Sequence, residues 1–138
     1  MTYLLLYFYV FFIGTINETN TLTIHITNIE NVEGTLEVAI FNSDERFLEE
    51  GQALKTISVK VKANAQTVVF KDLPSGNYAV SMYHDENSDG DFNRNFMGIP
   101  KEPYGFSNNF HPKFSAPKFE DCQFYLDADH TIEIALKG

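Results

Sequence analysis

Short segments in which apolar and polar residues alternate recur along most of this chain. A period of two puts one apolar face on a β-strand, whereas a helix needs a period of 3.6. The apolar positions are Leu22, Ile24 and Ile26; Leu36, Val38 and Ile40; Ile57, Val59 and Val61; Val68 and Phe70; Tyr78, Val80 and Met82; Cys122, Phe124 and Leu126; and Ile132, Ile134 and Leu136. Strands with one polar face suit antiparallel sheets that pack face to face. We therefore predict an all-β fold, an antiparallel β-sandwich of about seven strands, immunoglobulin-like or transthyretin-like.

The predicted strands fit one sandwich domain over residues 20–138, since a chain of 138 residues with 43% hydrophobic content can build a single core. Helix has little place in this prediction, apart from a short turn at 43–51 that carries Phe47 and Leu48. The segment 94–118 is rich in proline and shows no sustained alternation. Because its many aromatic residues argue against disorder, we predict one long ordered loop.

The first sixteen residues form an uncharged, mostly apolar stretch. It is too short for a membrane span and has the length of a secretory h-region. We interpret 1–16 as a removable signal peptide, which predicts a secreted, periplasmic or cell-surface protein with no stable membrane span in its mature form. The alternatives are an uncleaved anchor or a first buried strand.

The charge balance excludes one large class of partner. Ten basic residues against nineteen acidic ones give a net charge of -9, and the basic residues are scattered. A nucleic-acid binder needs a footprint of lysine and arginine, so we predict no nucleic-acid partner. The partner classes left open are a protein and a glycan.

The segment from His84 to Asn93 carries an oxygen-bearing side chain at every second position before a glycine. The candidate ligands are Asp85, Asn87, Asp89, Asp91 and Asn93, around Gly90. A hard cation takes six to eight oxygen ligands, and a loop with this spacing can wrap around one. The alternative is an ion-free turn, because Asn, Asp and Gly favour turns without any metal. The regular spacing favours a calcium site, and an oxygen-only ligand set disfavours zinc and iron.

This loop departs from an EF-hand loop at the last ligand position, where Phe96 replaces a bidentate glutamate. The missing oxygen must come from elsewhere. We predict Glu102 as that ligand, and Asn95, Asn108 and Asn109 are the other candidates. Because the carboxylates are few, the expected affinity is weak, on the order of 0.1 to 1 mM, which is useful only outside the cytoplasm.

Two residue types associated with catalysis are predicted to be structural. Cys122 is the only cysteine, so it forms no disulfide within the chain, and its place on an apolar strand face predicts a buried, inert thiol. His84 lies on the apolar face of the fifth predicted strand, which predicts a hydrogen-bonded, semi-buried histidine and not a metal ligand. A metal-assisted hydrolase using His84 or His111 with Asp85 or Glu86 is a weak alternative, since no G-x-S-x-G or HExxH motif is present. We predict no enzymatic activity.

The aromatic residues of the long loop allow two interpretations. Tyr104 and Phe106 offer a stacking platform for a carbohydrate or another ligand, with Asn108 and Asn109 as hydrogen-bonding groups. Alternatively, the rings close the open end of the sandwich. Closure is favoured because soluble proteins seldom expose large apolar patches.

Several motifs together resemble a known family. They are His84-Asp85-Glu86-Asn87 leading to Gly90, Gly98-Ile99-Pro100-Lys101-Glu102, Tyr104-Gly105-Phe106-Ser107-Asn108-Asn109, and Leu73-Pro74 with Gly76 and Tyr78. From Leu22 to its end the chain resembles the secreted bacterial proteins grouped as DUF2141. The resemblance implies an exported β-rich domain and supplies no established activity. Members often have aspartate where this chain has Asn93, which removes one charge from the candidate site. The resemblance also implies that the long loop folds back over the Asp85 loop, with Glu102 or Asn108 close to it.

Overall fold

A computed structural model describes residues 14, 18–90 and 102–138 of the chain. Its elements are β1 (Thr19–Thr27), β2 (Thr35–Phe41), β3 (Lys55–Lys60), β4 (Gln66–Pro74), β5 (Gly76–Asp85), β6 (Tyr104–Phe106), the 3-10 turn η1 (Ser107–Asn109), α1 (Phe119–Cys122), β7 (Phe124–Leu126) and β8 (His130–Ala135). Apart from Gly14, the predicted signal peptide at 1–16 lies outside the described residues. Within the described residues, no helix has the length and apolar character needed to cross a membrane.

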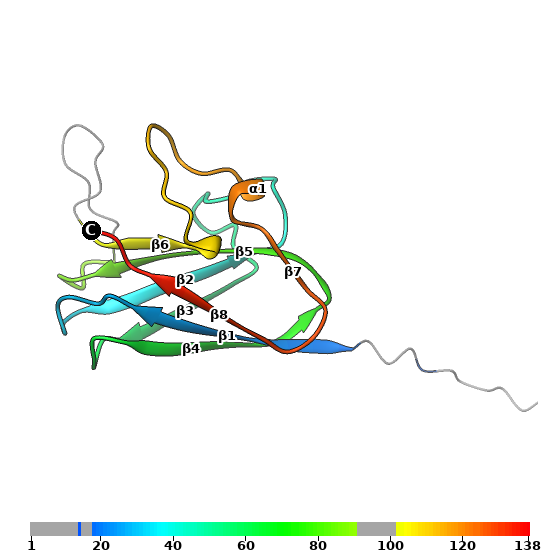
Figure 1. Cartoon of the computed structure of the whole chain (residues 1–138), viewed down its shortest axis with the longest axis horizontal. Coiled ribbons are helices and arrows are strands. Elements are labelled where there is room, and N and C mark those ends of the chain that lie inside the picture. Colours follow the sequence, from blue (N-terminus) through cyan, green and yellow to red (C-terminus); the bar gives the residue numbers. More distant parts are fainter. Residues whose placement is uncertain (1–13, 15–17, 91–101) are drawn as a thin grey trace, which may run out of the picture.

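Two sheets pack face to face, as Figure 1 shows. One has the strand order β4-β1-β8, and the other has the order β3-β2-β5-β6 with β7 paired to β5. The inward-facing residues of both sheets form one apolar core, because alternate residues of each strand point to the same side. Its most deeply buried members include Leu22, Ile24, Ile26, Leu36, Ile40, Val80, Leu126 and Ile134. The prediction of an all-β sandwich is therefore confirmed.

One strand pair differs from the predicted antiparallel arrangement. β8 runs parallel to β1, with Ile24 opposite Ile132 and Ile26 opposite Ile134. Alternation reports which face of a strand is buried, but it carries no information about the direction of the neighbouring strand. The parallel pair places the C-terminal strand beside the N-terminal one.

The long loop contains regular structure that alternation did not predict. Tyr104–Phe106 forms β6, which pairs with β5 so that Tyr83 lies opposite Tyr104, and η1 follows directly. Gly105 leaves no room for a side chain, because a Cβ there would lie 2.7 Å from a methyl group of Ile134. β6 is thus a short edge strand of the larger sheet.

The stretch predicted as a strand around Cys122 begins as a helical turn. The backbone N–H of Lys118 donates to the carboxylate of Asp121 (2.9 Å), and the N–H of Asp121 donates to the carbonyl of Lys118 (3.0 Å). Together these bonds close α1, whose buried residues are Phe119 and Cys122, and only 124–126 continues as a strand. Local side-chain capping has therefore replaced the predicted strand conformation.

A second, smaller apolar cluster lies on the outer side of the larger sheet. It is built from Phe41, Ala79, Phe119 and Cys122, with Phe47, Leu48, Phe106 and Phe110 packed against it. The turn predicted at 43–51 supplies two of these residues, and the hydroxyl of Ser43 accepts the N–H of Glu45 (3.1 Å). α1 and this turn together cover one end of the sheet.

Cys122 is buried and unpaired in this cluster, as predicted. Burial, with a smaller contribution from the charge of Asp121, raises the pKa of its thiol from 9.0 to about 11. The unfolded chain therefore loses the thiol proton at a lower pH than the folded protein does. The stability linked to this thiol is fully present below the unfolded-state pKa and is lost as the pH rises through the folded-state pKa. We therefore expect unfolding to become easier between pH 9.0 and about 11 in a way that a Cys122→Ala variant does not show.

Candidate metal site

The Asp85 loop begins where β5 ends and is closed by its first residue. The carboxylate of Asp85 accepts the backbone N–H groups of Asp89 (3.2 Å) and Gly90 (2.8 Å). Positive φ angles at Ser88 (54°) and Gly90 (80°) turn the chain back toward β5. The Asp85 side chain is only 1% exposed, so this charge-bearing group is held inside the protein by backbone donors.

Asp89 and Asn87 form the outer side of the loop. The amide of Asn87 donates to the carboxylate of Asp89 (3.1 Å), and the side-chain oxygen of Asn87 accepts the N–H of Asp89 (3.3 Å). Both residues are exposed. The hydroxyl of Tyr83 donates to the carbonyl of Gly90 (3.3 Å), which fixes the far end of the turn to β5.

Glu102 reaches this loop from the segment that enters β6. Its carboxylate accepts the backbone N–H of Glu86 (2.9 Å), and the carbonyl of the next residue, Pro103, accepts the N–H of His84 (2.8 Å). Glu102 is 6% exposed. Glu102 therefore lies against the Asp85 loop, as predicted, whereas residues 94–101 of the predicted long loop lie outside the described residues.

Three carboxyl groups meet at this point. One oxygen from each of Asp85, Asp89 and Glu102 lies within 4.8 Å of the others. Ionised carboxylates this close repel one another, and a bound divalent cation relieves that repulsion. The cluster could therefore hold a metal. Of the other predicted ligands, Asn87 bonds to Asp89, and Asp91 and Asn93 lie outside the described residues.

The β1–β2 connection also contacts the residues around Asp85, and the sequence did not indicate this. The side-chain amide of Asn31 donates to the carboxylate of Glu86 (3.0 Å). Nε2 of His84 lies 2.6 Å from the carbonyl oxygen of Glu33, and His84 is fully buried. The predicted hydrogen bond of His84 is confirmed, but the residue is fully buried and not semi-buried as predicted.

The predicted ligand-binding residues of the aromatic segment make their contacts with other parts of the fold. Tyr104 and Phe106 are half-buried, with ring centroids 5.9 Å apart. The amide of Asn108 donates to the carbonyl of Gln123 (2.9 Å). The amide of Asn109 donates to the carbonyl of Glu133 (3.3 Å), and its oxygen accepts the N–H of Ala135 (2.9 Å). Asn108 therefore bonds to the backbone between α1 and β7, whereas Asn109 bonds to β8. The role of both residues in ligand binding stays a prediction.

The fold and the acidic cluster define a β-sandwich domain with a candidate cation site at one end of its larger sheet. The family described as "Uncharacterized protein conserved in bacteria (DUF2141)" matches residues 24–134, and the chain belongs to this family. No curated protein and no solved structure matches the chain. The matched region runs from β1 to β8, so it includes both sheets and all three clustered carboxyl groups.

Proposed function

We propose that this protein is an exported, non-enzymatic binding module in which Asp85, Asp89 and Glu102 hold a calcium ion. The observation that carries the proposal is the convergence of three carboxyl groups within 4.8 Å from two separate segments of the chain. The sequence between 90 and 102 separates Glu102 from the loop, so the convergence is a result of the tertiary fold.

The choice of calcium follows from the ligand chemistry. Carboxylate oxygens suit hard cations, and calcium accepts irregular sets of oxygen ligands, whereas magnesium needs near-ideal octahedral geometry and keeps several waters. The loop geometry is set by backbone hydrogen bonds to Asp85 and Glu102, so these two carboxylates are already positioned before any ion arrives. Such preorganisation lowers the entropic penalty of binding.

The bound ion would stabilise the folded state. It would join the end of β5 to the segment that enters β6, and binding to the folded state alone adds to stability by mass action. A weak site is filled only where calcium is abundant, which agrees with the export expected from the apolar stretch at 1–16. Calcium would then order this end of the sandwich after export.

Thermal unfolding of the full chain in EDTA and in millimolar calcium tests the proposal. At free calcium ten times the dissociation constant we expect a gain of about 1.4 kcal/mol. For a domain of this size that gain raises Tm by about 4 to 6 °C. Asp89→Asn keeps the side-chain size, removes one charge from the cluster, and should abolish the calcium response.

Asp72→Asn is the matched control, because Asp72 is an exposed aspartate on β4 and its positive φ of 58° is one that asparagine tolerates. This variant should respond to calcium as the parent does. Equal melting temperatures of the parent in EDTA and in calcium would refute the proposal, and so would equal responses of the two variants.

A further inference from the structure

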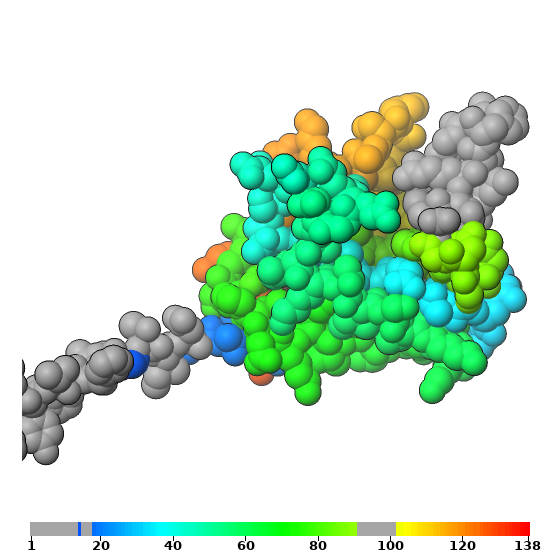
Figure 2. Space-filling view, turned by 180° about the vertical axis from the view of Figure 1, so that it is seen from behind, coloured from blue at the N-terminus to red at the C-terminus, as the bar shows by residue number. Residues whose placement is uncertain are grey.

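The segment 110–118, between η1 and α1, carries a fully exposed aromatic residue. Phe114 is 100% exposed, whereas the other exposed large apolar side chains among the described residues are between 39% and 61% exposed. Figure 1 shows this yellow-to-orange loop standing above the sheets, and Figure 2 shows it from the opposite side, again rising above the body. Water contact on every side of a phenylalanine is unfavourable, so this position needs an explanation.

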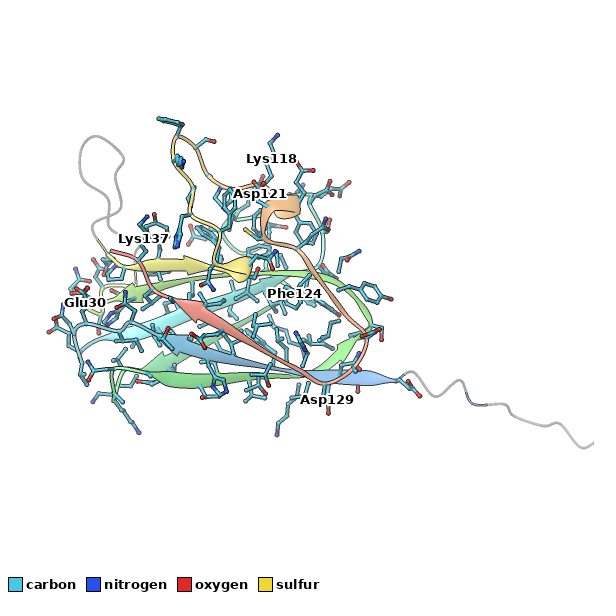
Figure 3. The ribbon with its side chains drawn as sticks, in the orientation of Figure 1. Glu30, Lys118, Asp121, Phe124, Asp129 and Lys137 are labelled. Carbon is cyan, nitrogen blue, oxygen red and sulfur yellow. The ribbon has the colours of Figure 1, made fainter. Side chains whose placement is uncertain are left out.

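The charge of this segment is opposite to that of the whole protein. The net charge is -9, yet no acidic residue occurs between Glu102 and Glu120, while His111, Lys113 and Lys118 all lie in this interval. All three of these basic side chains are exposed. In Figure 3 Lys118 points away from the sheets, and Asp121 lies beneath it at the foot of the loop. The loop therefore combines one fully exposed apolar ring with exposed basic side chains and has no carboxylate of its own.

Both ends of the segment are fixed to the body. Phe110 packs against the outer apolar cluster, Phe119 belongs to it, and Pro117 is buried. The N–H of Lys118 donates to Asp121 (2.9 Å) and the N–H of Phe110 donates to the carbonyl of Ser107 (3.5 Å). Because the loop is anchored at both ends, Phe114 projects from a defined place on the domain.

We propose that this tip docks on an anionic lipid surface, with Phe114 entering the interfacial region and the lysines contacting the headgroups. Aromatic side chains favour the membrane–water interface, and basic residues near an anionic leaflet add electrostatic attraction. A single exposed ring can insert into a lipid interface, because lipid needs no pocket of complementary shape. The neighbouring lysines can contact the headgroups.

The absence of tryptophan from the whole chain allows a local test. Phe114→Trp in the full chain places a unique fluorophore at the tip, so its signal is independent of other membrane contacts. With phosphatidylserine-containing vesicles we expect a blue shift of the emission and quenching by brominated lipid. Adding Lys113→Gln and Lys118→Gln should remove both signals, as should high salt.

Tyr125→Trp is the matched control, since Tyr125 is an exposed aromatic (61%) on β7, outside the loop. Its emission should not respond to the same vesicles. The proposal is overturned if the F114W emission is unchanged by anionic vesicles, which would leave a protein pocket as the occupant to seek. It is also overturned if phosphatidylcholine alone gives the same shift, or if both tryptophan variants respond equally.

Discussion

Replacement of Gly34 by alanine is expected to lower the free energy of unfolding by at least about 3 kcal/mol. Gly34 has a φ of +67°, and a Cβ there would lie 2.0 Å from the carbonyl oxygen of Asp85 and 2.8 Å from Cα of Glu86. Both neighbours are backbone atoms, so no side-chain rotation can relieve the overlap. The β1–β2 connection would have to separate from the first residues of the Asp85 loop.

Gly51→Ala is the matched control for this variant. Gly51 has a φ of +75°, but its Cβ would meet no atom within 4 Å. The loss of stability in the Gly51→Ala variant therefore measures only the cost of placing alanine in a left-handed backbone conformation, which is about 1 kcal/mol. Urea unfolding of both variants separates the two contributions. Equal losses for G34A and G51A would show that the close approach to Asp85 contributes nothing.

The strands of this fold could be predicted because the signal for them is local. Residues such as Ile24 and Ile26 alternate with polar neighbours whatever their partners are, so the buried face can be read from the sequence. β6 could not be predicted in this way, because three residues around Gly105 form a strand only through their pairing with β5. The parallel direction of β8 also depends on a partner that is distant in the chain.

The candidate site shows the same division between local and tertiary information. The spacing of Asp85 and Asp89 is local. The need for a further ligand made Glu102 one of four candidates, and its carboxyl group does lie close to the other two. The supporting contacts of Asn31 and Glu33 involve residues far from the loop in sequence, and no pattern in the chain indicates them. The hydrogen bonds of Asn109 to β8 could not be predicted either, because an asparagine amide bonds equally well to a ligand and to a strand backbone.

Replacement of Ser107 by alanine is the other variant with a large expected effect, a loss of about 3 kcal/mol. The hydroxyl of Ser107 is fully buried, accepts the N–H of Val80 (2.9 Å) and donates to the carbonyl of Cys122 (2.5 Å). It thus continues the hydrogen bonding of β5 where β6 ends and ties α1 to the sheet. Alanine would leave two buried backbone groups without these bonds, and each such group costs about 1 to 3 kcal/mol.

Ser58→Ala is the matched control, because the hydroxyl of Ser58 is exposed and donates to Glu37 (2.6 Å) on the surface of β3. Its expected loss is about 0.5 kcal/mol, since water replaces the missing bond. Amide hydrogen exchange gives the local measurement: the Val80 amide should exchange faster in the Ser107→Ala variant and at the parental rate in the control. Unchanged exchange at Val80, or similar losses of stability in both variants, would mean that the hydroxyl of Ser107 does not hold this junction together. If the expected result is obtained, the Ser107-Asn108-Asn109 motif joins β5, the α1–β7 region and β8 through side-chain bonds to their backbones.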